Sequence, residues 1–336
     1  MPEAIVVREY GGAKALVCEA VDVPTPGPGE LRVRQTAIGV NYHDVYVRSG
    51  LYKTLALPGI PGCEAVGVVD AVGDAVTRFA AGDRIAYVTP HYGAYTSHRV
   101  LAEPLAVRLD DGVSDVQAAS NLLRAMTVDM LVQRVCQVQA AHTVLVHAAA
   151  GGVGRLLCQW AAHVGARVIG TVGSAAKAER ARQAGCAHTV LYRDVDVIEA
   201  VADITDGAGV DVVFDSVGAD TFASSLAVLK PCGHLVNFGQ SSGPVDPIDM
   251  PTLASKSLTV SRPILFHYMA DTERYQTMAD AALHALQHGV LATPVAMPFA
   301  LHEAWRAHAL LESGEGGGAI VLLPPRYSET GDAPAL

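Results

Sequence analysis

The sequence predicts an α/β protein with a β-rich lobe and a second lobe built on a doubly wound parallel sheet. Three observations support this fold class. The chain has 336 residues, more than one small hydrophobic core normally organises. Residues 1 to about 120 contain short apolar stretches broken by glycine and proline, which is typical of β-rich structure. From about residue 122, apolar stretches alternate with helical patterns, which predicts βαβ units.

This change of pattern sets the expected domain boundaries. We expect residues 1–122 to form the first part of the β-rich lobe and residues 123–264 to form the parallel-sheet lobe. Residues 265–336 contain helical patterns and then a strand-like run at 319–323. We expect this last segment to return to the β-rich lobe and to close it with a helix and a strand.

Composition and charge narrow the classes of partner. Half of the residues are apolar and 17% are charged, as in a well-packed globular enzyme. The formal net charge is −10 and no run of lysine or arginine stands out, so we expect no nucleic acid partner. Residues 1–7 lack a signal-peptide pattern and no apolar stretch has membrane-spanning length, so we expect a cytoplasmic protein without a membrane partner. The six cysteines form no C-x-x-C pair, and we expect them to be reduced.

The most informative motif is a glycine-rich turn between a strand and a helix. An apolar strand over residues 143–147 runs into this turn, and a helical pattern follows over residues 156–164. In such a unit, glycines let the backbone approach a pyrophosphate, which binds the amides at the helix N-terminus. The glycine motif is incomplete, because Ala149 replaces the first glycine of G-x-G-x-x-G. The prediction of a Rossmann dinucleotide site therefore depends on the strand and the helix that flank the turn. The cofactor-binding residues expected in the turn are Gly151, Gly152, Val153 and Gly154.

The end of the next strand predicts NADPH rather than NADH. An NAD site normally places an acidic residue there for the ribose 2′-hydroxyl, and residues 168–174 contain none. The cofactor residues expected instead are Gly173, Ser174, Lys177 and Tyr192, with Arg193 beside them. Such side chains bind a 2′-phosphate by charge and hydrogen bonds. The alternative is that the two cations are ordinary surface residues.

Two later strand ends are expected to line the cofactor as well, because ligands bind at the carboxyl ends of parallel strands. They are residues 215–218 and 237–243. The alternative for their glycines is simple turn formation. The cofactor-binding residues predicted here are Val217, Phe238, Gly239, Ser241 and Ser242.

Several longer motifs resemble those of a known family. They are IGVNYHDVYVRSGLY at residues 38–52, PGCEAVG at 61–67 and AAGDR at 80–84, and the glycine-rich turn and the later strand ends continue the pattern. From about residue 4 to 324 the chain resembles the zinc-independent, zeta-crystallin-type quinone oxidoreductases of the medium-chain dehydrogenase/reductase superfamily. The resemblance implies a GroES-like catalytic domain beside a Rossmann domain, and a homodimer.

The same motifs predict that no metal is bound. Zinc-dependent members of the superfamily place a cysteine near the position of Asn41 and a histidine in the motif occupied here by residues 62–64. A structural zinc would need four clustered cysteines, which residues 84–110 lack. His43 and Cys63 are too few for a metal site, and we interpret them as a hydrogen-bonded loop histidine and a packed cysteine. His147 is likewise expected to pack rather than to act as a general base.

The resemblance also implies roles for individual residues. It places Asn41, Tyr46 and Tyr52 in the catalytic site, where an amide and phenols can hydrogen-bond a carbonyl and stack on a flat acceptor. The alternative for a loop tyrosine is half-buried packing with its hydroxyl in water. Arg124 stands where relatives commonly carry lysine, which keeps the charge but not the geometry. Further cofactor contacts are assigned to Tyr42, Thr127 and Arg262.

We therefore expect an enzyme that passes hydride from NADPH to a small quinone without a metal. The protein must position the acceptor and stabilise charge on its oxygen, and the resonance of a reduced quinone makes this feasible. The first alternative is an NADPH-dependent reductase of the C=C bond of an enone or alkenal on the same scaffold. The second is a non-catalytic NADPH-binding sensor or structural protein. We expect the homodimer to form through edge strands of the nucleotide sheet near residues 237–260.

Overall fold

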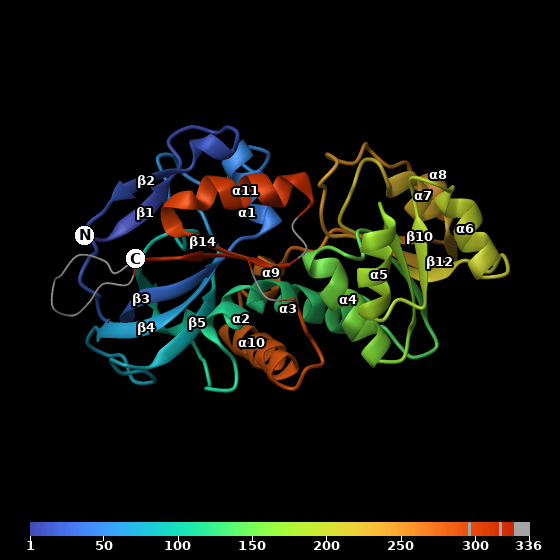
Figure 1. The fold of residues 1–336 in the computed structure, drawn as a ribbon. Helices are drawn as coiled ribbons and strands as arrows, with labels where there is room; N and C mark the ends of the chain where they lie inside the picture. The colour runs from blue at the N-terminus through green and yellow to red at the C-terminus, as the bar shows by residue number, and fades with distance from the viewer. Residues whose placement is uncertain (295–296, 316–317, 326–336) are drawn as a thin grey trace. The chain divides into compact units, whose positions relative to one another are not determined.

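A computed structural model describes residues 1–294, 297–315 and 318–325. The chain divides into two compact units, which are drawn in Figure 1. Unit 1 comprises Met1–Leu123, Ala270–Gln287 and the described residues from Thr293 onward, and unit 2 comprises Arg124–Met269 and His288–Ala292. The chain thus passes between units after residues 123 and 269, where the sequence predicted 122 and 264, and it returns briefly to unit 2 at 288–292.

Unit 1 is built mainly from antiparallel strands. They are β1 (Glu3–Val6), β2 (Val17–Ala20), β3 (Glu30–Gly39), β4 (Glu64–Val72), β5 (Arg84–Val88), β6 (His98–Ala102), β7 (Val107–Arg108), β14 (Met297–Ala300) and β15 (Ile320–Leu323). β1 pairs with β2, and the others form a sheet of order β14-β15-β3-β4-β5-β7 with β6 also on β3. Because β15 pairs with β3, the C-terminal segment belongs to this sheet.

The helices of unit 1 include two that the sequence did not predict, α1 (Tyr42–Ser49) and α2 (Asp115–Ala119). The others are α10 (Thr272–Gln287) and α11 (Ala304–Ser313), with the start of α3 (Leu122–Asp129). The prediction that His43, Tyr42 and Tyr46 are loop residues is wrong, because they lie on α1, whereas Tyr52 follows the helix. The Asp44 carboxylate accepts a hydrogen bond from the Asn41 N–H at 2.8 Å, which caps this helix, and Gly50 ends it at φ 83°.

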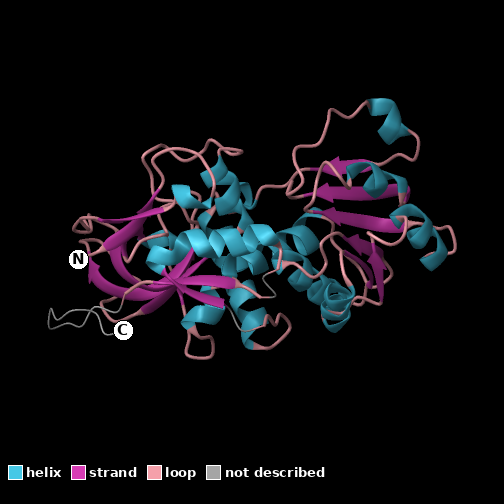
Figure 2. Ribbon diagram, turned by 45° about the horizontal axis from the view of Figure 1, so that its top comes forward, coloured by secondary structure: helices cyan, strands magenta, loops and turns pink. Residues whose placement is uncertain are grey.

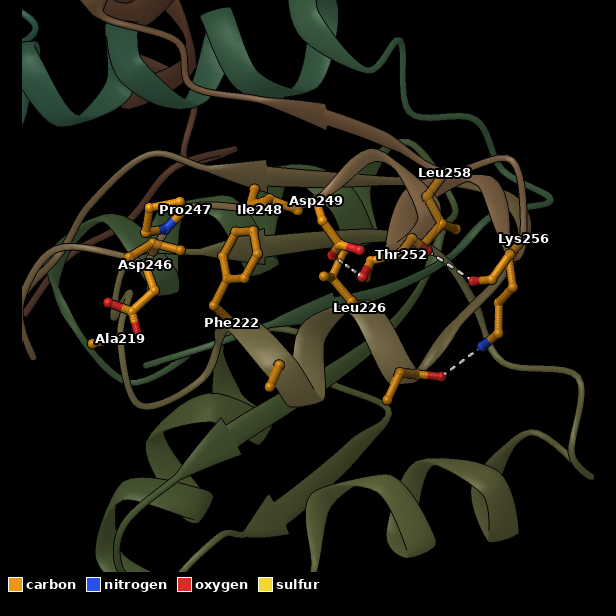
Figure 3. A pocket seen from close by; sticks show the side chains of 14 residues that line it. Ala219, Phe222, Leu226, Asp246, Pro247, Ile248, Asp249, Thr252, Lys256 and Leu258 are labelled. Carbon is orange, nitrogen blue, oxygen red and sulfur yellow. Dashed lines mark hydrogen bonds between the residues drawn. The ribbon is translucent and has the colours of Figure 1, made fainter.

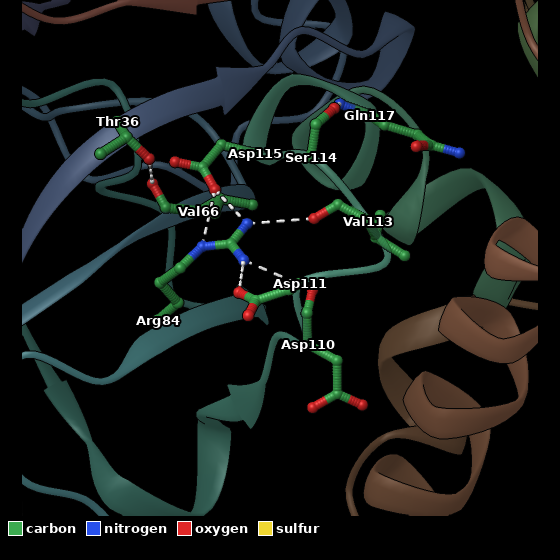
Figure 4. A network of polar contacts seen from close by, with 9 residues as sticks. All are labelled: Thr36, Val66, Arg84, Asp110, Asp111, Val113, Ser114, Asp115 and Gln117. Atoms are coloured by element: carbon green, nitrogen blue, oxygen red, sulfur yellow. Dashed lines mark hydrogen bonds and ion pairs between the residues drawn. The ribbon is translucent and has the colours of Figure 1, made fainter.

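Arg84 ties β5 to the segment that leads into α2 (Figure 4). Its guanidinium donates to the Asp115 carboxylate at 2.7 Å, to Asp111 at 3.1 Å and to the Val113 carbonyl at 3.0 Å. The Ser114 hydroxyl caps α2 by accepting the N–H of Gln117. These bonds determine where the chain leaves the sheet toward α2 and α3.

Unit 2 contains a parallel sheet. Its strands are β8 (Thr143–Val146), β9 (Arg167–Val172), β10 (His188–Leu191), β11 (Val210–Asp215), β12 (Leu229–Asn237) and β13 (Thr259–Ser261). Their order is β10-β9-β8-β11-β12-β13, and every neighbouring pair is parallel. Counted from β8, this is the 3-2-1-4-5-6 order of a Rossmann sheet. The predicted doubly wound α/β lobe is confirmed.

Helices connect these strands and cover both faces of the sheet (Figure 2). They are α4 (Gly152–His163), α5 (Ala175–Gln183), α6 (Val197–Ile204), α7 (Phe222–Ala227), α8 (Met250–Ala254) and α9 (Leu265–Tyr268), with a π-helical stretch at Met130–Val135. The connections lead outward from β8 in one direction and from β11 in the other. Because crossovers between parallel strands are right-handed as a rule, helices then lie on opposite faces of the sheet. Within the described ranges, no helix combines the length and the apolar content that a membrane crossing requires.

Candidate active site

The glycine-rich turn follows β8, next to β11, where the strand order of unit 2 reverses. Ligands of such sheets bind at this position. Ala148 has a φ of 51°, which is uncommon for a residue with a side chain, and Gly151 precedes the first helical residues Gly152 and Val153. A Cβ on Gly154 would lie 2.3 Å from the Ala148 carbonyl oxygen, so only glycine fits there. The turn therefore presents the N-terminus of α4, which is an anion-binding feature.

Arg124 packs over the start of α4. A Cβ on Gly152 would lie 3.1 Å from both Cζ and Nε of Arg124, so the glycine makes room for the guanidinium. Arg124 is only 6% exposed. A buried guanidinium beside a helix N-terminus adds positive charge where a pyrophosphate would bind.

The residues predicted to bind a 2′-phosphate surround Gly173. A Cβ on Gly173 would lie 2.6 Å from the Tyr192 hydroxyl and 3.4 Å from Nε of Arg193. The Ser174 hydroxyl accepts the N–H of Lys177 at 3.3 Å and so begins α5 beside them. Tyr192 is 49% exposed. The structure thus brings this predicted group together at the carboxyl ends of β9 and β10.

A buried polar network holds the loop after β11. The Asp215 carboxylate accepts the N–H of Val217 at 2.8 Å and the hydroxyl of Ser225 at 3.0 Å. Ser225 also lies 3.0 Å from Nε2 of His147, whose Nδ1 lies 2.9 Å from the Thr171 hydroxyl. Burial lowers the pKa of His147, which keeps its imidazole neutral. His147 therefore joins β8, β9 and α7 inside the unit, and the prediction that it packs is confirmed.

The loop after β12 lies against the loop after β11. A Cβ on Gly239 would lie 2.6 Å from the Ser216 carbonyl oxygen, and the Ser242 hydroxyl donates to the Val217 carbonyl at 2.8 Å. Arg262, just past β13, donates to the Asn237 carbonyl at 3.1 Å. The predicted cofactor residues at these strand ends are Val217, Phe238, Gly239, Ser241, Ser242 and Arg262. Thr127 is half-buried on α3 in the same unit.

In unit 1, the predicted acceptor residues belong to a cluster of rings on and just after α1. The ring centroids of Tyr42 and Tyr46 are 5.2 Å apart, and those of Tyr46 and Tyr52 are 5.0 Å apart. His43 lies 5.7 Å from Tyr52 and stacks on Tyr92 at 5.9 Å with an interplanar angle of 15°. We call these five residues the aromatic cluster. Rings of this kind suit a flat acceptor.

Sequence reasoning missed Tyr92 altogether. It lies in the turn between β5 and β6, 49 residues after His43. The only local signal was an aromatic residue followed by Gly93, which does not say which side chain the ring contacts.

Asn41 is held by the buried carboxylate of Glu64, which lies in the PGCEAVG motif of residues 61–67. Nδ2 of Asn41 donates to Oε1 of Glu64 at 2.6 Å, and the N–H of Leu123 donates to Oε2 at 2.8 Å. Glu64 is 1% exposed. A Cβ on Gly39 would lie 2.3 Å from Oε1, so that glycine makes room for the carboxylate. The available signal was a charged residue directly before the apolar run of residues 65–69.

Buried polar side chains fix α1 against α11. The Tyr95 hydroxyl donates to Asp44 at 3.0 Å and lies 3.0 Å from Nε2 of His308. Burial and the nearby Arg48 charge lower the pKa of His308 to about 3, so its imidazole is neutral. The guanidinium of Arg48 makes two bonds to the Glu312 carboxylate, at 3.0 and 2.7 Å. Both ends of α1 are thereby held, together with the tyrosines that it carries.

A separate cavity of about 470 Å³ lies in unit 2 (Figure 3). It is lined by Phe222 and Leu226 of α7 and by Ile248 and Leu258, which follow β12 in the chain. Lys256 at its rim donates to the Ala227 carbonyl at 2.8 Å. None of the predicted cofactor residues lines this cavity, so it is separate from the candidate nucleotide site.

Comparison with known proteins identifies the family. Residues 27–106 match the model of the alcohol dehydrogenase GroES-like domain, and residues 152–284 match that of the zinc-binding dehydrogenase. A quinone oxidoreductase of Pseudomonas aeruginosa is 44% identical over 325 residues, which cover 96% of this chain and all of the relative. The chain belongs to the zinc-independent quinone oxidoreductases of the medium-chain dehydrogenase/reductase superfamily. The predictions of a GroES-like domain and of an oxidoreductase are therefore confirmed.

Two further proteins show the range of this quinone oxidoreductase family. The crystal structure of Escherichia coli quinone oxidoreductase complexed with NADPH matches with a TM-score of 0.92 and 38% identity, covering 96% of this chain and all of that one. A 2-haloacrylate reductase of Burkholderia sp. is 41% identical over 331 residues, covering 96% of this chain and 99% of the relative. Although one family model is named for zinc, the described residues hold no group of three or more metal-ligating side chains.

Proposed function

We propose that this quinone oxidoreductase family member transfers a hydride from NADPH to a small quinone without using a metal. The observation that carries the proposal is the assembly of unit 2: the glycine-rich turn, the group around Gly173 and the later strand-end loops all follow the carboxyl ends of one parallel sheet. The similar proteins from P. aeruginosa and E. coli are both quinone oxidoreductases, which supports the same activity for this chain.

The residues of unit 2 fit NADPH. The turn from Gly151 to Gly154 and the guanidinium of Arg124 would hold the pyrophosphate, because glycine leaves the backbone open and the charge is complementary. Lys177, Tyr192 and Arg193 would hold the 2′-phosphate. When bound, NADPH supplies the hydride.

The aromatic cluster of unit 1 would hold the acceptor. We assign the Tyr46 hydroxyl as the donor to the acceptor oxygen, with the rings of Tyr42 and Tyr52 stacking on a flat substrate. Asn41, oriented by Glu64, would help to position the acceptor. A reduced quinone spreads its negative charge by resonance, so hydroxyl donors suffice where an unactivated ketone needs a Lewis acid.

The test is steady-state oxidation of NADPH and NADH against 1,4-benzoquinone, 9,10-phenanthrenequinone and a simple alkenal, after dialysis against a chelator. We expect quinone turnover that prefers NADPH and that survives dialysis. Loss of turnover on dialysis, restored by zinc, would contradict the metal-free mechanism.

The second candidate is NADPH-dependent reduction of a conjugated C=C bond, and the similarity to a 2-haloacrylate reductase favours it specifically. Turnover with the alkenal but not with the quinones would select this activity. NADPH binding without any turnover would instead favour a sensor or structural role.

Replacing Lys177 with alanine should weaken NADPH binding about 10-fold to 100-fold and leave NADH binding nearly unchanged. A charge-assisted hydrogen bond contributes about 1.5–3 kcal/mol, and only NADPH carries the 2′-phosphate that would receive it. Dissociation constants from cofactor fluorescence measure the effect. Arg180→Ala, on the same helix α5, is the matched control. Equal weakening of both cofactors would overturn the assignment of Lys177.

We further propose a cytoplasmic homodimer. Of the segment near residues 237–260 predicted to pair the two copies, only β13 forms an edge of the sheet, because β12 lies between β11 and β13. The dimer would therefore use β13. Sedimentation of the purified protein measures the oligomeric state.

A further inference from the structure

Tyr92 is held in a strained backbone conformation. Its φ is 45°, in the left-handed region that bulky side chains rarely adopt, and Gly93 follows at φ 87°. Strain of this kind persists only where the surrounding structure enforces it, and it clusters at functional sites. The ring of Tyr92 is buried and stacks on His43 of the aromatic cluster. The strain therefore places one hydroxyl beside one imidazole.

A hydrogen-bonded chain runs through this hydroxyl from the surface to His43, within the aromatic cluster. Thr54 is exposed to solvent, and its hydroxyl bonds the Tyr92 hydroxyl. The Tyr92 hydroxyl lies 3.3 Å from Nε2 of His43, whose ring in turn lies 5.7 Å from that of Tyr52. Three side chains thus connect bulk water with the rings assigned to the acceptor.

His43 has the protonation state that a relay requires. Burial lowers its pKa to about 4, so near pH 7 the ring carries one proton, with one nitrogen donating and the other accepting. A neutral imidazole can take up a proton at one nitrogen while releasing another from the second. Thr54 and Tyr92 can likewise each pass on one proton and receive another.

We propose that Thr54, Tyr92 and His43 form a proton relay that serves the reduced acceptor. The proposal rests on the proposed function, since it concerns the quinone bound at the aromatic cluster. Addition of hydride converts the quinone into a hydroquinone monoanion, which needs one proton to become the neutral product. In the proposed mechanism Tyr46 donates a hydrogen bond to the acceptor oxygen, and no group is yet assigned to release a proton to it.

The relay moves one proton and no electrons. The N–H bond at Nδ1 of His43 breaks as an O–H bond forms on the hydroquinone anion. At the same time Nε2 of His43 takes up the proton of the Tyr92 hydroxyl. The Tyr92 oxygen takes up the proton of the Thr54 hydroxyl, and the Thr54 oxygen takes up a proton from water. The hydroxide left behind is neutralised by buffer, and exchange with water restores the starting tautomer of His43.

The decisive variant is Tyr92→Phe, which keeps the stacked ring and removes only the hydroxyl. Two acceptors of nearly the same shape separate proton delivery from substrate fit: 2,6-dimethyl-1,4-benzoquinone gives a weakly acidic hydroquinone, and 2,6-dichloro-1,4-benzoquinone gives a more acidic one. We expect kcat to fall about 100-fold with the dimethyl acceptor and by less than about threefold with the dichloro acceptor, because general acid catalysis matters most for a basic oxygen.

Two further variants test whether the effect is specific to the relay. Tyr10→Phe removes a tyrosine hydroxyl that donates to the Leu55 carbonyl, next to Thr54 but outside the relay, and should leave kcat with both acceptors unchanged. Thr54→Val should lower kcat with the dimethyl acceptor only a few-fold, since water can replace an exposed hydroxyl.

A readout independent of turnover is ¹⁵N NMR of the imidazole, with the His43 signal identified by its loss in His43→Gln. We expect Nε2 of His43 to carry no proton in the wild-type protein, and Tyr92→Phe to change this tautomer. A fixed Nε2–H tautomer in the wild-type protein would overturn the relay direction.

The possible outcomes distinguish failure of the relay from failure of the proposed function. If the wild-type protein reduces both quinones but Tyr92→Phe slows both equally, or slows neither, the relay is wrong and the proposed function stands. If the wild-type protein reduces neither quinone, the proposed function fails and the relay fails with it.

Discussion

Replacing Gly154 with alanine is expected to abolish measurable NADPH binding and to lower the free energy of unfolding by about 3 kcal/mol. Gly154 lies inside α4, where alanine would normally favour the helix by about 1 kcal/mol. Here the added Cβ would lie 2.3 Å from the Ala148 carbonyl oxygen and 3.0 Å from its carbon. Because these are backbone atoms, the turn itself must move, and the start of α4 moves with it.

Gly151→Ala is the matched control for this prediction. Its Cβ would meet the same Ala148 oxygen at 3.1 Å, and its φ of −77° suits any residue. We expect a stability change below about 1 kcal/mol and a smaller loss of NADPH affinity than in Gly154→Ala. Thermal unfolding and cofactor fluorescence measure the two effects. Wild-type NADPH affinity in Gly154→Ala would show that the turn does not need the close approach described here.

Replacing Glu64 with alanine is expected to cost about 3–5 kcal/mol of stability and to lower quinone turnover at least about 100-fold. The substitution removes the acceptor of two buried donors, Nδ2 of Asn41 and the N–H of Leu123. Each buried donor that loses its partner costs about 1–3 kcal/mol, and the missing side chain leaves a cavity. Asn41 would also lose the bond that orients its amide, which explains the expected loss of turnover.

Glu64→Gln distinguishes the two oxygens of the carboxylate. Since both accept hydrogen bonds, the amide nitrogen of a glutamine must face one donor, and we expect a loss of stability between those of wild type and Glu64→Ala. Glu19→Ala, at a solvent-exposed ion pair with Arg8, should change neither stability nor turnover. Chemical unfolding and steady-state kinetics measure both. If Glu64→Ala destabilised the protein but kept wild-type kcat, Asn41 would have no part in positioning the substrates.

The sequence alone determined the parts of this protein that depend on local pattern. The strand, turn and helix around Gly151 predicted the dinucleotide lobe because strand and helix periodicities and glycine at a tight turn are local properties. The missing acid after β9, with Lys177 and Tyr192 in its place, predicted NADPH for a similar reason. The order of these motifs along the chain also supported the family resemblance, which the comparisons confirmed.

Only the tertiary structure showed which distant side chains meet. Glu64 contacts Asn41 from 23 residues away, Tyr92 contacts His43 from 49 residues away, and Glu312 pairs with Arg48 across 264 residues. The spacing of these residues in the sequence does not reveal that they are in contact. The register of the sheet and the packing of α1 against α11 decide which residues become neighbours. The strained φ of Tyr92 and the close approach at Gly39 follow from the same packing. Local chemistry therefore identified the cofactor lobe, whereas non-local packing built the acceptor cluster and the buried groups that hold it.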